Sequence, residues 1–411
     1  MRIIAYRSLV NKGKVLLQES TGESVHSNKL DELFGFVLEP QAASDWPPQY
    51  DKCIRVAWEL DSFVAPILKL LGEVKCHRLH QNHKCYCVPF NCFYIPSKIF
   101  SVEHIPSKAR ANFYDLQQYF PELSEPKDLV EVQMLGELLL KELKKMGFEP
   151  TKLTSPVAIY EETVLAFLDL PKVGDMPKEA AIYAGACMGR AYIEAFQLGY
   201  FKEVFDYDLA SAYSSIAKEL VDFRVCKWVQ SDKYQPGAIY GYAKCLVTIY
   251  DWVMVHPILY ETEDGSLETR TGTWERFTQK CEMDFIDKWS IGSYQILDGW
   301  WVIPPKHKGG LPQPLKASTE KLLAYKRGTG LQVALSKRMS MFSGKFGEQR
   351  QDGFGPYFNP CWKAEINTTV NLMVAAWLYA YGIGPGDNEG YKHLIHVSVD
   401  GVLLDKEVEL V

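Results

Sequence analysis

Two acidic residues, each at the end of an apolar and β-prone segment, have the types and spacing that could do chemistry. Asp208 ends the segment 205–208, and Asp400 follows the segment 396–399. Two carboxylates that converge at strand ends could hold a pair of Mg²⁺ ions for phosphoryl transfer. Each residue alone has a simpler interpretation, because Asp208 could cap a helix and Asp400-Gly401 could form a hairpin turn. Their occurrence together favours the metal site.

A basic segment lies between these acids in the sequence. Residues 316–345 contain seven Lys and Arg side chains and one acid, Glu320. Two helical pieces around Gly328-Thr329-Gly330 predict a helical hairpin. Lys326 and Lys337 would direct a basic face toward the acids, where a nucleoside triphosphate with about four negative charges would need cations. The alternative is a basic helix face that contacts only solvent.

The segment after the first of these acids carries a recognisable motif. Segment 208–215 reads Asp-Leu-Ala-Ser-Ala-Tyr-Ser-Ser. With Asp208, Ser211, Tyr213 and Ser215 it is similar to the motif Asp-x-x-Ser-x-Tyr-Pro-Ser, in which Ser214 takes the place of Pro. This is motif A of the family B DNA polymerases, which the chain resembles from about residue 150 to its end, above all in the compact forms of phages, plasmids and viruses.

Two further motifs of the family are present with departures. In segment 398–401, similar to motif C, Asp400 takes the place of the Asp that binds metal most directly, and Ser398 replaces the other Asp. Motif B is the most eroded, because Ser340 and Ser343 stand where the family has Asn and Tyr. Its end, Gly344-Lys345-Phe346-Gly347, fits well. A motif of the Tyr-x-Gly-Gly type, followed by Arg, is matched best by Gly189-Arg190, and the later Asn-Pro by Asn359-Pro360.

The resemblance implies a role for each matching residue. Asp208 and Asp400 would be catalytic and would bind two Mg²⁺ ions, or Mn²⁺ in their place, with the backbone carbonyl of Leu209. Tyr213 would lie under the sugar and exclude a 2′-hydroxyl, the alternative being a core tyrosine. The nucleotide-binding set would be Ser211, Ala212, Tyr213, Lys326, Lys337, Arg338 and Ser340. The DNA-binding set would be Gly189, Arg190, Gly344, Lys345 and Gly347.

The first 150 residues are similar to the proofreading exonuclease domain of the same family, in a degraded form. That domain needs four acidic metal ligands, yet residues 1–8 contain no acid. Asp61 and Asp115 have counterparts in the family. We therefore expect a structural RNase H-like domain, and we do not expect 3′–5′ exonuclease activity.

Cysteines and histidines crowd residues 76–87, which is a density typical of zinc sites. The candidate ligands are Cys76, His80, Cys85 and Cys87. Their spacing matches no standard zinc finger, so a loop followed by a core strand is the alternative.

Composition limits the class of protein. The chain has 411 residues, 47% of them hydrophobic, and a net charge of −6, which argues against a uniformly basic nucleic-acid binder but not against a local basic groove. Its ten cysteines have no scaffold-like spacing, as in reduced cytosolic proteins. No signal peptide and no apolar run of about 18 residues are present, so we expect a cytoplasmic protein, in the host cytosol if a phage or virus encodes it, and no membrane contact.

The expected fold is α/β and α+β multidomain. An RNase H-like domain (1–150) and a linker (151–177) precede a palm of antiparallel strands and helices (178–312 and 349–411), interrupted by helical-hairpin fingers (313–348). We predict helices over 127–147, 178–196, 273–289 and 359–381, strands within 1–100 and 235–305, and strands at 203–207 and 394–399. No thumb is expected within this sequence, so a separate thumb-containing chain or a replication accessory protein is an expected partner.

These observations favour template-directed DNA synthesis from primer–template DNA and dNTPs. The alternative is a catalytically impaired polymerase fold that serves as a nucleic-acid-binding or assembly scaffold, as the eroded motif B and Ser398 would allow. A metal-dependent nuclease would need a fuller acidic set than residues 1–150 offer.

Overall fold

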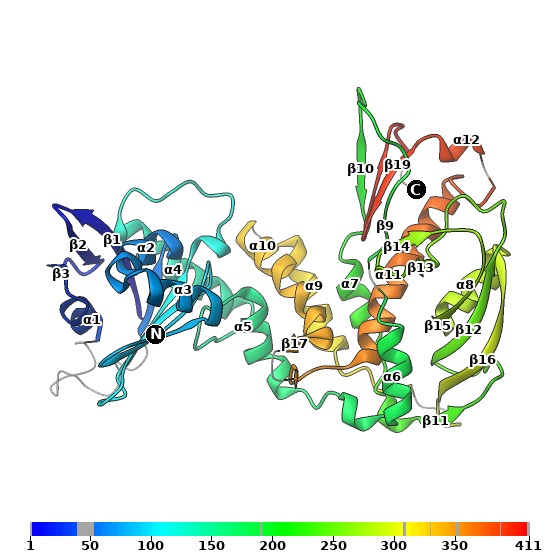
Figure 1. Ribbon diagram of the computed structural model, residues 1–411, viewed down its shortest axis with the longest axis horizontal. Coiled ribbons are helices and arrows are strands. Elements are labelled where there is room, and N and C mark those ends of the chain that lie inside the picture. The colour runs from blue at the N-terminus through cyan, green and yellow to red at the C-terminus, as the bar shows by residue number, and fades with distance from the viewer. Residues whose placement is uncertain are drawn as a thin grey trace. The chain divides into compact units, whose positions relative to one another are not determined.

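The computed structural model describes residues 2–38, 53–189, 191–306, 310–328, 330–350, 353–386 and 388–408. The chain divides into two compact units (Figure 1). Unit 1 contains Met1–Phe167 and Ala324–Met339, and unit 2 contains Leu168–Leu323 and Ser340–Val411. Among the described helices, none is both long enough and apolar enough to cross a membrane. The mixed α/β multidomain fold expected from the sequence is confirmed.

Unit 1 is built on an eight-stranded mixed sheet of order β3-β2-β1-β4-β8-β7-β6-β5. Strand β4 runs parallel to both β1 and β8, and the other neighbours are antiparallel. The predicted strand-rich start of the chain is confirmed. The strands are β1 (Arg2–Asn11), β2 (Lys14–Glu19), β3 (Ser24–Ser27), β4 (Cys53–Ala57), β5 (Lys84–Cys87), β6 (Phe90–Ile95), β7 (Ile99–His104) and β8 (Arg110–Asp115).

Helices cover this sheet and complete unit 1. The sheet core includes the rings of Tyr6, Phe63 and Phe113, which meet at centroid distances of 5.0 to 6.5 Å. Helix α4 approaches β1 closely, because a Cβ at Gly136 would lie 2.8 Å from Ile3 Cγ2. The helices are α1 (Leu30–Leu38), α2 (Leu60–Leu71), α3 (Glu73–Asn82), η3 (Gln117–Tyr119), α4 (Leu129–Lys145), α5 (Pro156–Thr163), η4 (Leu165–Phe167), η7 (Tyr325–Arg327) and α10 (Gly330–Met339).

Unit 2 contains two four-stranded antiparallel sheets, of order β10-β20-β19-β9 and β11-β16-β12-β15. Two short hairpins, β13–β14 and β17–β18, are also present. The strands are β9 (Ile193–Ala195), β10 (Phe205–Asp208), β11 (Lys227–Gln230), β12 (Tyr240–Ile249), β13 (Leu259–Glu261), β14 (Leu267–Thr269), β15 (Gly272–Gln279), β16 (Gly292–Ile303), β17 (Gln349–Arg350), β18 (Gly353–Phe354), β19 (Leu394–Ser398) and β20 (Gly401–Leu404).

Helix α11 (Pro360–Ala380) is the central helix of unit 2 and confirms the helix predicted for 359–381. Asn359 caps it by accepting a hydrogen bond from Trp362 N at 3.0 Å, and Pro360 suits its first turn. Its residues share one hydrophobic core with residues of both sheets, so it fixes the sheets relative to each other. The other helices are η5 (Val173–Asp175), α6 (Lys178–Ala186), α7 (Ala212–Ala217), η6 (Phe223–Val225), α8 (Lys280–Trp289), α9 (Lys316–Ala324), η8 (Ser340–Gly347) and α12 (Asn388–Tyr391).

Two helix predictions were wrong in extent. The helix expected over 178–196 ends at Ala186, and residues 193–195 instead form β9, which pairs with β19. The helix expected over 273–289 begins at Lys280, because residues 272–279 pair with β12 along their whole length. In both places, pairing with a distant strand outweighs local helix propensity.

The boundary between the units falls within the segment expected to be a linker, 151–177. The segment expected to form the fingers, 313–348, is divided, because residues 324–339 group with unit 1. There α10 contacts α4 and α5, and Gln332 donates a hydrogen bond to Glu142 Oε2 at 2.9 Å. The two helices expected to form the fingers, α9 and α10, thus group with different units, and the proposed domain boundaries remain a prediction.

Candidate active site

Strands β10 and β20 bring the two acids of the sequence motifs side by side. Asp208 is paired in register with Gly401, and Asp400 directly precedes it in the turn between β19 and β20. The amide of Leu209 donates a hydrogen bond to the carbonyl of Asp400 at 2.8 Å. Segments almost 200 residues apart are thus joined where their strands end, and Figure 1 shows β10 beside the red hairpin of β19 and β20, with β20 as its direct neighbour in the sheet.

The turn that carries Asp400 has an unusual backbone. Val399 has a φ of 58°, in the left-handed region that β-branched residues rarely adopt. Its amide donates to the carbonyl of buried Tyr192 at 2.9 Å, and Tyr192 N donates to Asn371 Oδ1 of α11 at 3.1 Å. These hydrogen bonds connect the turn to the central helix α11 and so fix the backbone position from which the Asp400 side chain extends.

Gly401 allows its strand to lie close to the backbone of β10. A Cβ at this position would lie 3.2 Å from the carbonyl oxygen of Tyr207, which is a tight contact, and 3.8 Å from Asp208 Oδ1, which is an ordinary one. The Asp208 carboxylate therefore lies beside the turn that carries Asp400.

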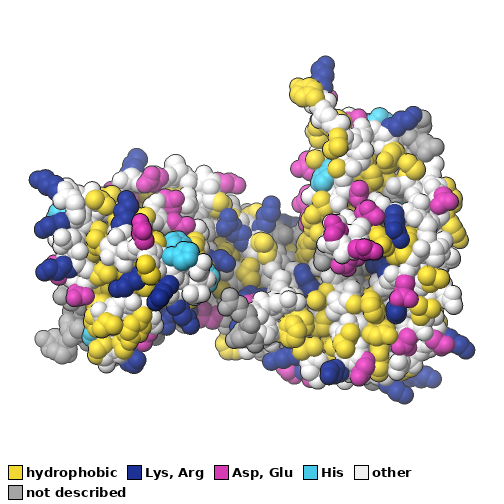
Figure 2. Space-filling model, viewed as in Figure 1, with side chains coloured by type: hydrophobic (Ala, Val, Ile, Leu, Met, Phe, Trp, Pro, Cys, Tyr) yellow, Lys and Arg dark blue, Asp and Glu magenta, His cyan; other side chains and the backbone are white. Residues whose placement is uncertain are grey.

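Both acids line one pocket of about 160 Å³. Its walls are Asp206, Tyr207, Asp208, Leu209, Val374, Trp377, Asp400, Gly401 and Val402. Asp206 was not among the predicted site residues, although the two-residue period of a strand places it on the same face as Asp208. In the space-filling view, acidic side chains gather on unit 2 near the end of β10 (Figure 2), which would attract cations.

The donor set of this pocket suits Mg²⁺ but is sparse. The described residues contain no group of three or more His, Cys, Asp or Glu side chains that could hold a metal. Mg²⁺ is commonly bound by one or two carboxylates together with substrate phosphates. The carbonyl of Leu209 accepts from Ala212 N at 3.2 Å, which leaves it a second lone pair. Two carboxylates and one carbonyl oxygen therefore fit ions that substrate phosphates help to hold.

The residues predicted around the nucleotide sugar follow directly after Asp208. Ser211 adopts a left-handed φ of 62° and begins α7, and Ala212 is buried. Tyr213 is half-buried, and burial together with the nearby charge of Asp400 raises the pKa of its hydroxyl. Ser340 is buried, and its carbonyl accepts from Ser214 Oγ at 3.4 Å. Tyr213 thus lies within electrostatic range of an acid of the pocket.

The basic residues predicted to bind the triphosphate belong to unit 1. Lys337 is exposed on α10, and the guanidinium of Arg338 donates to the backbone carbonyl of Gln118. The side chain of Lys326 lies outside the described residues. The structure therefore does not group these residues with Asp208 and Asp400 in one unit.

The residues predicted to contact DNA lie near α11 and η8. Gly189 accepts a hydrogen bond from Asn367 Nδ2 at 2.9 Å, and Gly344 is exposed. A Cβ at Gly347 would lie 3.1 to 3.3 Å from the side chain of Lys363. Lys345 forms an ion pair with Glu348 at 3.1 Å. Arg190 lies outside the described residues.

The four candidate zinc ligands are divided between α3 and β5, and the described residues form no group of three or more that could hold a metal. The core strand expected as the alternative is β5, but the helix α3 stands where a loop was expected. Cys85 and Cys87 alternate along β5, face the core together and lie 3.5 Å apart at sulfur. His80 instead packs against the ring of Tyr94. Cys76 lies on α3, and among the described residues it belongs to no group of side chains that could hold a metal. The strand period, rather than a metal, explains the cysteine spacing.

The two acids kept from the exonuclease motifs hold backbone in place. Asp61 accepts from Tyr94 Oη at 2.6 Å and from the amide and hydroxyl of Ser97, both at 2.8 Å. Buried Asp115 accepts from the amides of Leu60 at 3.0 Å and Gln118 at 3.1 Å. Both carboxylates serve as structural acceptors.

Comparison with known proteins shows the fold. No protein-family model and no curated protein matches the chain. The ternary complex of Phi29 DNA polymerase with primer-template DNA and incoming nucleotide matches with a TM-score of 0.62 at 11% identity, over 99% of this chain and 80% of that chain. Its complex with single-stranded DNA matches with a TM-score of 0.58 at 11% identity, over 100% and 81%.

The post-translocation binary complex of the same polymerase with primer-template DNA gives a TM-score of 0.61 at 10% identity, over 100% and 81% of the two chains. The expected resemblance to a DNA polymerase is thus confirmed for the fold of the whole chain. At this identity the likeness shows the fold alone.

Proposed function

We propose that this protein adds deoxynucleotides to a primer 3′-hydroxyl under the direction of a template. The observation that carries the proposal is the meeting of Asp208 and Asp400 in one pocket at the β10–β20 edge. The fold around this pocket matches a polymerase whose solved structures hold primer-template DNA and nucleotide. We infer the same partners for this chain.

The chain's own residues would bind and orient the reactants. Asp208, Asp400 and the carbonyl of Leu209 would hold two Mg²⁺ ions, which stabilise the attacking and leaving oxygens when bound. Tyr213 would pack against the sugar of the incoming nucleotide. The apolar wall formed by Val374 and Trp377 lowers the local dielectric and so strengthens the interaction of the acids with cations.

A nucleotide-incorporation assay tests this function. The purified chain is mixed with a labelled primer–template, Mg²⁺ and one dNTP at a time. We expect the primer to grow by one residue only with the dNTP complementary to the template. Extension without regard to the template would indicate terminal transfer, and no extension with any dNTP would contradict the proposal.

One observation favours the alternative of a scaffold without catalysis. The guanidinium of Arg338 is engaged by the Gln118 carbonyl within unit 1, so it is occupied in a structural contact. Tight binding of primer–template without nucleotide addition would support that second function.

A further inference from the structure

Several cations lie around the end of η8, and most of them already have a carboxylate partner. Glu348 lies 3.1 Å from Lys345 Nζ and 3.1 Å from Arg350 Nη2. Its single negative charge is shared between these two cations. Lys345, which the sequence motif singled out for DNA, therefore has much of its charge compensated within the protein.

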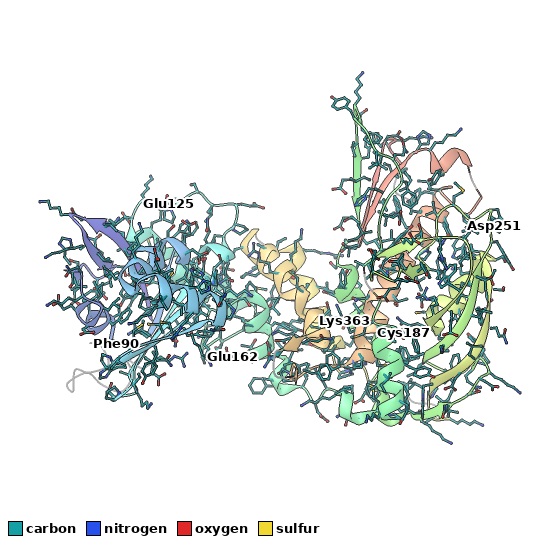
Figure 3. The ribbon with its side chains drawn as sticks, in the orientation of Figure 1. Phe90, Glu125, Glu162, Cys187, Asp251 and Lys363 are labelled. Atoms are coloured by element: carbon teal, nitrogen blue, oxygen red, sulfur yellow. The ribbon has the colours of Figure 1, made fainter. Side chains whose placement is uncertain are left out.

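Lys363 is the exception in this neighbourhood. It lies near the start of α11 (Figure 3), and its side chain runs across Gly347, with Cγ, Cδ and Cε all within 3.3 Å of where a Cβ would be. Among the described residues, the ammonium of Lys363 has no carboxylate within ion-pair distance and donates no hydrogen bond. Burial alone lowers the pKa of its ammonium. Within the described part of the chain, the ammonium of Lys363 thus loses hydration without gaining a counter-charge.

The close contact explains why residue 347 is a glycine. Any side chain there would have to displace the methylenes of Lys363 or move the backbone. The absence of a side chain at Gly347 therefore leaves the space that the methylenes of Lys363 occupy. This role of Gly347 does not depend on a contact of its own with DNA.

The position of Lys363 on α11 connects it to the pocket. Val374, a pocket wall residue, follows it by eleven residues on the same helix, which is about three turns at 3.6 residues each. The two side chains therefore share one face and are separated by about 16 Å along the axis at 1.5 Å per residue. Asn367 lies between them on that face and contacts the Gly189 carbonyl.

We propose that Lys363 binds a backbone phosphate of the primer–template, several nucleotides from the reacting end. This inference rests on the proposed function. A phosphate would supply the negative charge that Lys363 does not find among the described residues, and a DNA strand carries one phosphate per about 3.4 Å of duplex axis. If the strand follows α11, the contacted phosphate lies about five nucleotides from the pocket.

Salt-dependent binding of a fluorescent primer–template with a recessed 3′ end tests the proposal. Lys363→Gln should weaken binding by roughly fivefold to tenfold and lower the slope of log K against log salt by about 0.9, the value for one phosphate contact. Lys227→Gln removes the same charge from an exposed position on β11 of the same unit and should leave the slope unchanged. Lys345→Gln should have a smaller effect than Lys363→Gln.

Neutral phosphates locate the contact. A methylphosphonate placed at one phosphate at a time should weaken binding to the wild-type protein at the phosphate that Lys363 contacts, about five nucleotides from the primer end. The same substitution should have no effect on Lys363→Gln. If Lys363→Gln does not fold, Lys363→Met keeps the apolar stem over Gly347 and replaces it in both assays.

The outcomes separate this inference from the proposed function. A wild-type protein that extends primers, together with a Lys363 variant of unchanged slope, would overturn the inference and leave the function intact. A folded wild-type protein that neither binds nor extends the primer–template would overturn both.

Discussion

The two units use carboxylates in opposite ways. In unit 1, Asp61 and Asp115 are occupied by hydrogen bonds from backbone amides and hydroxyls. In unit 2, Asp208 is exposed at a strand end, and its carboxylate has no hydrogen bond or ion pair with the described part of the chain. An acid that satisfies buried donors stabilises a fold, whereas an acid left open in a pocket can accept a cation. The partners of a carboxylate, more than its motif, distinguish the two roles.

The largest expected effect follows from removing a charge in unit 2. Asp208→Asn or Asp400→Asn should reduce primer extension by about a thousandfold, because loss of a metal ligand forfeits several kcal/mol of transition-state stabilisation. The thermal midpoint of Asp208→Asn should change little, since Asp208 is exposed. Asp61→Asn is the matched control and should leave extension of the folded protein nearly unchanged. Equal losses for Asp61→Asn and Asp208→Asn would remove the distinction between the units.

A smaller effect is expected for the choice of sugar. If Tyr213 packs under the sugar, Tyr213→Ala should raise ribonucleotide incorporation relative to dNTPs by roughly tenfold to a hundredfold, because steric exclusion is lost. Tyr213→Phe keeps the ring and should retain the discrimination. Competition of matched rNTP and dNTP for one template position measures it. Unchanged discrimination in Tyr213→Ala would leave this residue as a packing residue.

The third prediction concerns the stability of unit 1. Asp115→Ala should lower the free energy of unfolding by about 2 kcal/mol, because the amides of Leu60 and Gln118 lose their acceptor in a buried place. Urea denaturation followed by fluorescence measures this change. Asp208→Ala should cost far less by the same measurement. A neutral Asp115→Ala would show that water can replace the carboxylate.

The smallest effect is a difference in pH dependence. Burial opposes ionisation of Asp61, but hydrogen bonds from Tyr94 and Ser97 outweigh it and lower its pKa. This acid therefore contributes stability above the ordinary carboxyl pKa of about 4, and the contribution is lost as pH falls through the lowered value. Asp61→Asn should be less stable than wild type at pH 7, and the difference should shrink toward pH 2.

The pKa of Asp115 is shifted in the opposite direction, so its contribution to stability should change with pH in the opposite sense. Burial raises its pKa despite hydrogen bonds from backbone amides. Its contribution is complete below the ordinary carboxyl pKa and declines as pH rises through the raised value. If stability profiles of the Asp61 and Asp115 variants shifted in the same direction with pH, the assigned environments would be wrong.

The sequence predicted elements best where local pattern and tertiary contacts agree. The helix at 359–381 and the strands within residues 1–100 were predicted from periodicity, and both are confirmed. The strand at Ile193–Ala195 could not be read locally, because only pairing with β19 creates it. The division of residues 313–348 between the two units also could not be predicted from the sequence, because the contacts of α10 with α4 and α5 join residues far apart in sequence.

The candidate site was predictable in part. The order of apolar strand and acid indicated Asp208 and Asp400, and the register of β10 with β20 brings them to one pocket. Lys363 belongs to no motif. It is distinguished by its contact with Gly347 and by the lack of a carboxylate within ion-pair distance among the described residues. Lys345 matched a motif, but its pairing with Glu348 depends on the folded backbone.

Counting bound Mn²⁺ by electron paramagnetic resonance tests the central claim most directly. The protein is titrated with Mn²⁺ in the presence of a dideoxy-terminated primer–template and the matching dNTP. We predict two tightly bound ions in the wild type and in Asp61→Asn, and loss of both in Asp208→Asn and in Asp400→Asn. Ions that persist in the Asp208 and Asp400 variants, or that disappear in Asp61→Asn, would contradict the assignment of metal binding to unit 2.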